Sequence, residues 1–409
     1  MALLTYRGNP RCGGQGVYVN RLSRALSDLG HSVEVISGPP YPVVAGGVKL
    51  TRLPSLDLYR QPDPFRVPHP REFHSAVDVA EFALMCTGTF PEPLTFSLRA
   101  RRHLERRLGD FDVIHDNQGL GYGMLALARG PVPLVTTIHH PILVDRELDL
   151  AAAANCWRRL TLRRWYGFLH MQRRVAASMD RVITVSESSR QDIARTMGVD
   201  LDRISVVRLG VDADIFRPLP EVPRVPGRIL TTTSADVPLK GLVTLVRAMS
   251  RLRLTRPDAH LVIVGQPRPD GAVARTLSEL DLGEAVRFAG GISDEGLVRL
   301  YAEAELAVVP SLYEGFSLPA VEAMACGVPL VATTGGALPE VAGLDGETAL
   351  LVPPGDHQRL ATVIDNALGN PALRAHVGAA GRVRALELYT WEAAARGTAE
   401  QYRMAIGRC

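Results

Sequence analysis

The sequence predicts an α/β protein of two Rossmann-like domains, each built on a parallel sheet, and three observations support this prediction. At 409 residues the chain is too long for one ordinary hydrophobic core. Short apolar runs alternate with helical patterns in both halves, which is the order typical of βαβ units. A proline-dense linker, PLPEVPRVPG at 218–227, separates the halves. We therefore expect domains at 1–217 and 218–390 and a helical tail at 391–409.

The first domain opens with a strand, a glycine-rich turn and a helix. ALLTYR (2–7) is short and apolar, NPRCGGQG (9–16) is the turn, and apolar residues at helical spacing follow it. The turn lacks the order G-x-G-x-x-G, and no acidic residue closes the next strand. A dinucleotide-dependent dehydrogenase is therefore a poor match to this opening.

The rest of the first domain continues the alternation around one insertion. Residues 54–98 are proline-rich and irregular, with a predicted helix at 73–86. We interpret them as a region that shapes the acceptor site, because long insertions at strand ends are often functional. A basic helix, LRARRHLERRLG, follows at 98–109. The other strands that apolar runs predict in this domain are 31–38, 111–118, 133–141, 181–186 and 203–207.

The second domain shows the same alternation of strands and helices. Its predicted strands are 228–233, 261–265, 286–291, 306–311 and 329–334. Its predicted helices are 241–253, 272–280, one from Ser293 onward, 318–326, 337–343 and 357–369. In each half, the loops that follow the strands gather at one edge of a parallel sheet, which is where open α/β sheets bind ligands.

Two carboxylates bracket a strand–loop–helix unit in the second domain. Glu314 lies in the loop after the strand at 306–311, and Glu322 lies eight residues later in the helix that Pro319 opens. Both can face the strand ends, where carboxylates accept hydrogen bonds from the vicinal hydroxyls of a sugar or ribose. Either glutamate alone is usually a surface group or a helix-start charge. The pair within EGFSLPAVEAMACGVPLVA is far more specific.

Lysine is rare in this chain, which makes Lys240 informative. Only Lys49 and Lys240 are lysine among the 46 basic residues, a bias that genomic base composition explains. Lys240 opens a helix after a strand, so its charge adds to the helix-start dipole. We therefore expect an anion site at Lys240.

The sequence resembles the retaining GT-B glycosyltransferases of family 4, also called glycosyl transferases group 1. Their signature, E-G-F-x-L-P-x-x-E-A-M-A-x-G-x-P, occurs from Glu314 to Pro329, and the resemblance extends from Gly13 to Trp391. It implies two Rossmann-like domains whose sheets face a central cleft. It also implies transfer of a sugar, with retention, from a nucleoside diphosphate sugar to a hydroxyl of a lipid-linked or glycoside acceptor.

The resemblance implies a role for each of four side chains. Glu314 positions the hydroxyls of the donor sugar, and Glu322 holds the ribose. Lys240 binds the diphosphate. His139 ends the strand at 133–141 and contacts the donor sugar from the first domain, although a lone histidine is more often structural. The expected catalytic residues are Glu314, His139 and Lys240.

Backbone groups complete the donor site that the resemblance implies. Gly14 and Gly16 lie against the diphosphate, although a tight strand–helix turn without a ligand also explains them. Main-chain groups at Gly291 and Ile292 hold the base, whose identity the sequence does not show. The expected donor-binding set is Gly14, Gly16, Ser234, Lys240, Gly291, Ile292, Gly315, Phe316, Ser317, Leu318 and Glu322.

The chain departs from the family pattern at Ser234. Family members usually have an arginine six residues before the diphosphate-binding lysine, and Ser234 stands there. Stabilisation of the leaving group then depends on Lys240 with backbone amides, or on an arginine from elsewhere such as Arg11 or Arg208. No D-x-D motif or His/Cys cluster suggests a metal, so we expect neither a metal nor another cofactor.

The sequence gives weaker signals for the acceptor site than for the donor site. His115, near the end of the strand at 111–118, and Asn117 are the candidates for contact with the acceptor. Residues 1–218 carry a net charge of +6 against −3 for the remainder, which favours an anionic acceptor or membrane surface on this side. Residues 150–179 combine six arginines and two tryptophans with no Asp or Glu. This pattern is typical either of a membrane-surface helix or of an amphipathic helix with core-facing aromatics.

Composition limits the class of protein and its cellular location. No apolar run approaches 18 residues and the first residues lack a signal peptide's basic start. The five cysteines are scattered, which fits a reducing compartment. We expect a cytoplasmic protein, in peripheral contact with the inner membrane face if its basic segment binds lipid, and no nucleic-acid partner.

Two other functions stay open. A nucleotide-sugar epimerase on the same fold needs acid–base residues acting on a sugar carbon, and the spacing of the two glutamates favours transfer instead. A non-catalytic sugar-nucleotide binding protein is supported only by Ser234.

Overall fold

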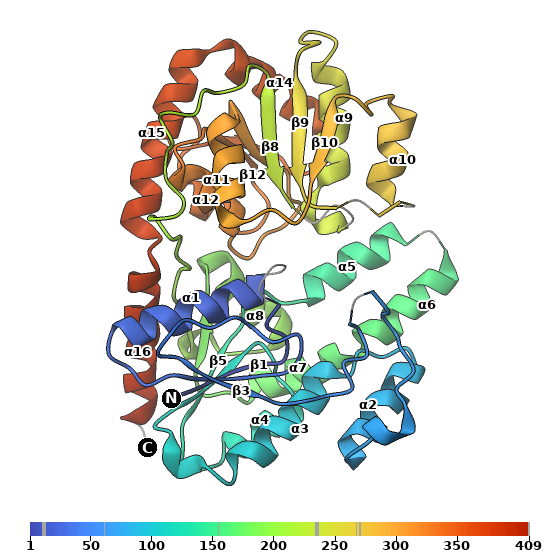
Figure 1. Ribbon diagram of the computed structural model, residues 1–409, viewed down its shortest axis with the longest axis vertical. Helices are drawn as coiled ribbons and strands as arrows, with labels where there is room; N and C mark the ends of the chain where they lie inside the picture. Colours follow the sequence, from blue (N-terminus) through green and yellow to red (C-terminus); the bar gives the residue numbers. More distant parts are fainter. Residues whose placement is uncertain are drawn as a thin grey trace. The chain divides into compact units, whose positions relative to one another are not determined.

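The chain forms two compact units. The computed structural model describes residues 1–9, 14–60, 62–153, 155–233, 237–266, 268–269 and 271–407. The first unit is Met1–Val207 with Ala394–Cys409, and the second is Arg208–Ala393 (Figure 1). The predicted domain boundary after residue 217 therefore lies inside the second unit.

The first unit contains a parallel sheet in the order β3-β2-β1-β4-β5-β6-β7. Strands β1, β2, β4 and β5 are buried along their whole length, as expected where helices cover both faces. Strand β3 was not predicted, because its residues KLTR are partly exposed and give no apolar run. The strands are β1 (Ala2–Thr5), β2 (Glu34–Ser37), β3 (Lys49–Arg52), β4 (Ile114–Asn117), β5 (Leu134–Thr137), β6 (Val182–Thr184) and β7 (Ile204–Val206).

Helices of the first unit differ from the prediction mainly around the insertion. The predicted helix at 73–86 starts only at Ala76, because the Ser75 side chain caps it by accepting from the Asp78 amide. The basic helix begins six residues early, at Glu92. The helices are α1 (Gly14–Asp28), α2 (Ala76–Cys86), α3 (Glu92–Leu104), α4 (Tyr122–Leu127), α5 (Leu143–Ala152), α6 (Cys156–Trp165), α7 (Leu169–Ala177), α8 (Glu187–Met197) and α16 (Trp391–Ile406).

The segment 150–179 is not one helix. Helices α5 and α6 form an arm at one side of the first unit, and α7 packs into the body (Figure 1). Trp165 lies against Phe90 and Tyr59, with ring centroids 5.0 and 5.5 Å away, so this tryptophan belongs to the core. Trp157 is 75% exposed. The core interpretation is therefore confirmed for Trp165, whereas the membrane-surface interpretation stays a prediction that the exposed Trp157 permits.

The second unit contains a parallel sheet in the order β10-β9-β8-β11-β12-β13. Its strands are β8 (Arg228–Thr232), β9 (His260–Val264), β10 (Val286–Ala289), β11 (Leu306–Val309), β12 (Leu330–Thr333) and β13 (Leu350–Val352). Its helices are α9 (Leu242–Leu252), α10 (Ala272–Glu279), α11 (Asp294–Glu303), α12 (Leu318–Ala325), α13 (Leu338–Ala342), α14 (His357–Gly369) and α15 (Pro371–Leu388). The prediction of two Rossmann-like domains with parallel sheets is confirmed. Across the described residues, no helix combines the length and the apolar character that a membrane span requires.

Candidate active site

Both sheets reverse their strand order at one point, and predicted site residues follow the strands beside it. The switch lies between β1 and β4 in the first unit and between β8 and β11 in the second. In open α/β sheets, ligands bind at the carboxyl ends of the strands at such a switch. In the second unit these loops carry Lys240, after β8, and Glu314, after β11.

Lys240 and Glu314 form an ion pair. The Lys240 Nζ donates to both carboxylate oxygens of Glu314, at 2.8 and 2.9 Å, and the Ser311 hydroxyl donates to Glu314 Oε1 at 2.6 Å. Glu314 is buried, whereas the Lys240 side chain is 29% exposed. The Lys240 side chain therefore remains partly accessible, and its charge offsets the repulsion between the carboxylate and an incoming anion.

A glycine at the start of α9 holds the two loops together. Gly241 has a φ of 64°, and a Cβ atom there would overlap the carbonyl oxygen of Pro310. The Leu312 amide donates to the Leu239 carbonyl at 2.7 Å. Backbone contacts thus fix the loops after β8 and β11 against each other, which positions the ion pair on rigid main chain.

The backbone between Glu314 and α12 is strained at Ser317. This residue has φ of 90° and ψ of 85°, a left-handed conformation that residues other than glycine rarely adopt. Its hydroxyl is buried and has no hydrogen-bond partner within the described ranges. An unpaired buried hydroxyl costs about 1–3 kcal/mol. A ligand oxygen bound to this hydroxyl and to the free amides of the first helical turn would remove that cost.

Phe316 can offer only backbone groups to a ligand. Its ring is buried and packs edge-on against Tyr389, with centroids 5.4 Å apart. The predicted donor contacts at Gly315 and Leu318 likewise concern main-chain groups on either side of Ser317.

Glu322 lies near the carboxyl end of the central strand β8. The Tyr301 hydroxyl contacts Thr232 Oγ1 at 3.2 Å and the Pro319 carbonyl at 3.3 Å. Burial, and next the neighbouring Glu322 carboxylate, raise the pKa of Tyr301. Because Thr232 is the last residue of β8, Glu322 is located where a ribose-binding carboxylate is expected. That role stays a prediction.

The turn after β10 is open. Gly291 has a φ of 69° and open space around its Cβ direction, and Ile292 is 36% exposed. The predicted main-chain contacts with a base are therefore sterically available. Ser234 lies outside the described residues, as does Arg11.

Arg208, the other arginine considered for the leaving group, has an acidic neighbour. Its Nη2 lies 3.4 Å from Glu340 Oε1, and the Arg208 side chain is 48% exposed. This contact uses one nitrogen of the guanidinium, so the contribution of Arg208 to leaving-group stabilisation stays a prediction.

In the first unit, His139 follows β5 and is held by two polar neighbours. Its Nε2 lies 2.8 Å from Asn117 Oδ1, and its amide donates to Gln118 Oε1 at 2.8 Å. Tyr18 packs edge-on against the ring, with centroids 4.6 Å apart. Burial lowers the pKa of His139 to about 3, so the imidazole is neutral near pH 7. With an acceptor opposite Nε2, the proton is assigned to Nε2 and Nδ1 is left as an acceptor.

His115 is part of the core, and its predicted contact with an acceptor is wrong. The side chain is fully buried, with Nδ1 2.6 Å from the Tyr402 hydroxyl and Nε2 2.6 Å from Thr137 Oγ1. Tyr18 extends the network, because its hydroxyl lies 3.1 Å from Thr137 Oγ1. Asn117 is equally buried and its Oδ1 contacts His139, but its Nδ2 has no hydrogen-bond partner among the described residues. Its predicted contact with an acceptor therefore stays a prediction.

The two glycines of the first turn have different surroundings. A Cβ atom at Gly16 would overlap the carbonyl oxygen of Asn9, so close packing alone requires this glycine. Gly14 has no atom within 4 Å of its Cβ direction. Only Gly14 therefore leaves open space for a ligand at the start of α1.

Sequence reasoning missed the residues that hold the site residues in place. Ser311 bonds Glu314, Gln118 orients the His139 backbone, and Tyr301 lies beside Glu322. The available signal was position, because Gln118 is the first residue after the buried strand β4 and Ser311 is the second after the buried strand β11. Tyr301 lies inside α11 and gave no such signal.

Two family models match this chain. Residues 12–215 match the model described as glycosyltransferase family 4, and residues 223–384 match the model described as glycosyl transferases group 1. Together they cover both units, and the second match includes Lys240, Glu314 and Glu322.

Relatives align over the full length of the chain. It is 50% identical to the MMP α-(1→4)-mannosyltransferase of Mycolicibacterium hassiacum, over 100% of this chain and 98% of that protein. It is 30% identical to a glycogen synthase of Mycobacterium tuberculosis, over 95% of this chain and 91% of that protein. Among solved structures, sucrose-phosphate synthase from Thermosynechococcus elongatus is similar, with a TM-score of 0.77 and 26% identity over 100% and 99% of the two chains.

Proposed function

Because the chain belongs to the family 4 glycosyltransferases of the GT-B fold, we propose that it moves a sugar from a nucleoside diphosphate donor to an acceptor hydroxyl with retention of configuration. The observation that carries this proposal is the Lys240–Glu314 ion pair at the strand switch point of the second unit. It combines a cation for a diphosphate with a carboxylate for sugar hydroxyls.

The ion pair suits a donor that carries both charge and hydroxyls. An ammonium has three donors, and Glu314 uses two of them, so Lys240 can bridge the carboxylate and a phosphate oxygen. Glu314 then accepts from hydroxyls of the donor sugar, while Glu322 accepts from the ribose. The strained Ser317 and the amides at the start of α12 bind phosphate or sugar oxygens.

We propose that the acceptor attacks from the face that the diphosphate leaves. The bond between the anomeric carbon and the phosphate oxygen breaks, and a bond from that carbon to the acceptor oxygen forms. The acceptor's proton passes to the departing phosphate oxygen, so no protein nucleophile is required. Neutral His139 hydrogen-bonds the donor sugar, and Lys240 with backbone amides stabilises the leaving group without a metal.

The relative from Mycolicibacterium hassiacum favours a specific sugar and linkage. Identity of 50% over the full chain supports a shared substrate class. We therefore propose that the sugar is mannose and that the product is an α-(1→4)-linked mannoside.

A panel of labelled donors tests this function. Purified protein is incubated with GDP-mannose, GDP-glucose, UDP-glucose and ADP-glucose, each with a short α-(1→4)-mannoside as acceptor. We expect a longer mannoside only with the mannosyl donor, with an α signal for the new linkage by NMR. A β linkage would contradict retention. An epimerised donor without a new glycoside, or binding without turnover, would support the two alternative functions instead.

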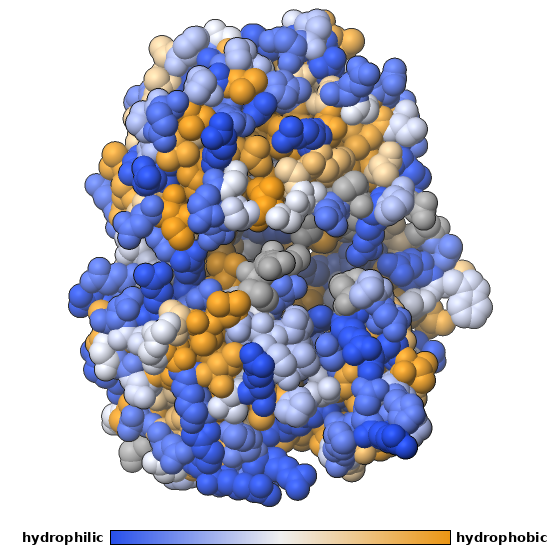
Figure 2. All heavy atoms as spheres, in the orientation of Figure 1, coloured by the Kyte–Doolittle hydropathy of each residue, from blue (hydrophilic) through white to orange (hydrophobic). Residues whose placement is uncertain are grey.

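We also propose that the arm of α5 and α6 contacts an anionic membrane surface. Arg158, Arg159, Arg163 and Arg164 are exposed, and in the described part of the chain none forms an ion pair with an acidic residue. Trp157 is 75% exposed beside them. Figure 2 shows mainly hydrophilic side chains over this arm with apolar ones among them. Arginines attract anionic headgroups, and an exposed tryptophan suits the membrane interface.

Liposome sedimentation tests the membrane contact. The protein should pellet with anionic vesicles and not with neutral ones, and binding should fall with salt because each arginine contributes about 1 kcal/mol through a screened attraction. Changing the four α6 arginines to Gln should abolish pelleting. The matched control changes four exposed arginines of the second unit, Arg217, Arg247, Arg287 and Arg359, to Gln. Equal pelleting of both variants would exclude α6 as the contact.

A further inference from the structure

One face of α3 and the turn after it carries a basic stripe that the proposed function does not use. Arg99, Arg102, His103 and Arg106 follow one another at i, i+3, i+4 and i+7, so they lie on the same side of the helix. The proposed donor and sugar contacts involve none of them.

The basic stripe borders a cavity of about 350 Å³ within the first unit. That volume is within the range of small-molecule pockets. The opposite walls come from the loop after β3, from the residues before α2 and from α2 itself. The lining residues are Leu53, Pro54, Ser55, Glu72, His74, Ser75, Asp78, Arg99, Arg102, His103 and Arg106.

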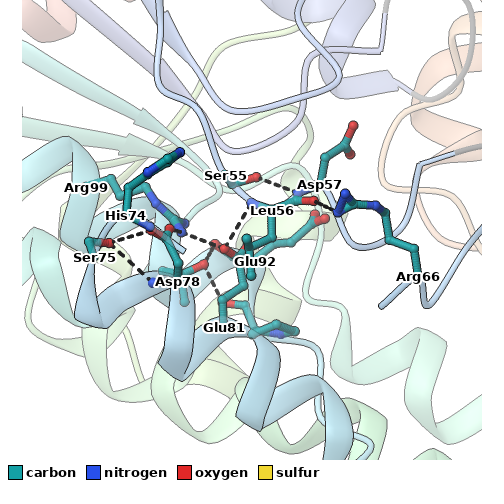
Figure 3. Close-up of polar contacts among 12 residues, drawn as sticks. Ser55, Leu56, Asp57, Arg66, His74, Ser75, Asp78, Glu81, Glu92 and Arg99 are labelled. Carbon is teal, nitrogen blue, oxygen red and sulfur yellow. Dashed lines mark hydrogen bonds and ion pairs between the residues drawn. The ribbon is translucent and has the colours of Figure 1, made fainter. Parts of the chain in front are cut away.

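Arg99 is held in a fixed orientation on the cavity wall. Its Nη2 donates to Asp78 Oδ1 at 2.5 Å and to Glu81 Oε2 at 2.6 Å (Figure 3). Asp78 is itself held by the Ser75 hydroxyl and the His74 amide, both at 2.9 Å. Both ion pairs of Arg99 use the same nitrogen, Nη2, so the N–H groups on Nε and Nη1 remain available for hydrogen bonds to a ligand.

A buried carboxyl lies behind this wall, and Glu92 Oε2 is 3.5 Å from Arg7 Nη1. Glu92 lies near Glu81 and Arg99 and is buried at the start of α3 (Figure 3). Burial raises the pKa of Glu92 to about 8, so at neutral pH this group is mainly protonated. The carboxylates that pair directly with Arg99 are Asp78 and Glu81.

Arg102 and Arg106 differ from the other arginines of this region in having no acidic partner. Arg101 pairs with Glu105, and Arg107 pairs with Glu34 and Asp110. Within the described residues, Arg102 and Arg106 form no ion pair. The cavity therefore has two uncompensated guanidinium groups next to the oriented Arg99.

We propose that this cavity binds a sugar that carries a phosphate or carboxylate group. Arg102 and Arg106 bind the anionic group, for which the planar guanidinium has matching geometry. Ser55, Glu72 and Asp78 on the other walls already accept from Asp57, Arg66 and Arg99. Their hydroxyl and carboxylate oxygens keep further lone pairs, which bind sugar hydroxyls. The ligand is either a free effector of the transferase or a charged part of its acceptor.

Calorimetric titration without any donor tests binding independently of the proposed reaction. The probes are mannose 6-phosphate, glucuronic acid, mannose and inorganic phosphate. We expect the two charged sugars to bind more tightly than either mannose or phosphate alone. The double variant Arg102→Gln/Arg106→Gln should weaken binding of the charged sugars by roughly 10-fold or more. Both side chains are exposed, so folding should be unaffected, which circular dichroism checks.

A charge-matched control and two kinetic assays complete the test. The control, Arg101→Gln/Arg129→Gln, removes two exposed arginines outside the cavity and should leave binding unchanged. If the ligand is a free effector, mannose 6-phosphate should alter transfer to an uncharged acceptor in wild type but not in the cavity variant. If it belongs to the acceptor, the variant should raise KM for a phosphorylated mannoside only. Equal binding by wild type and the cavity variant, or no binding of either charged sugar, would overturn the proposal.

Discussion

Replacing Glu314 with Gln is expected to lower kcat by roughly 10²-fold or more, as losses of positioned polar groups in active sites do. The amide loses the charge that balances Lys240, and it offers only one oxygen where the carboxylate offers two. Steady-state kinetics on the folded variant, with the donor that the panel selects, measures the effect.

The matched control for this variant is Glu279→Gln, an exposed carboxylate of α10 in the same unit. It should keep wild-type turnover. Turnover of Glu314→Gln close to wild type would remove Glu314 from the mechanism, although the chain's place in the family would stand.

Replacing Lys240 with Ala is expected to weaken binding of the nucleoside diphosphate roughly 10- to 100-fold, the range for a lost hydrogen bond to a charged group. Binding of the corresponding nucleoside should stay within a factor of two or so. The lost cation also leaves Glu314 without its main partner, so the remaining carboxylate repels the diphosphate. Calorimetric titration with both ligands measures the difference.

Two further variants sharpen this test. Lys49→Ala removes the other lysine of the chain, which pairs with Glu34 at 3.0 Å, and should leave both affinities unchanged. Adding Glu314→Gln to Lys240→Ala should restore part of the diphosphate affinity, because the repelling charge is gone. Equal losses for nucleoside and nucleoside diphosphate in Lys240→Ala would place the phosphate site elsewhere.

The fold was largely predictable because its signals are local. Buried strands such as β1 and β11 are short apolar runs, and the loops between them are marked by glycine or proline. Helix α15 was not predicted, because its apolar residues are spread around it and it contains Gly378 and Gly381. A Cβ at Gly378 would come within 2.7 Å of the Gly327 carbonyl, so close packing against another segment requires this glycine.

The candidate site was predictable only in part, because its contacts join distant residues. Lys240 and Glu314 were each predicted to bind the donor, but nothing local shows that two residues 74 positions apart form an ion pair. The prediction for His115 failed for a related reason. A position near a strand's end is visible in the sequence, whereas burial by a helix from the far end of the chain is not.

The network around His115 has a consequence for the order in which this protein folds during synthesis. Tyr402 bonds His115, and Gln401 bonds Arg181 at 2.6 Å, yet both partners on α16 are translated only after the whole second unit. The first unit emerges early but lacks this part of its core until the whole second unit has been translated. The first unit is therefore completed only after the second has been translated, and a truncation within α16 acts on the amino-terminal unit.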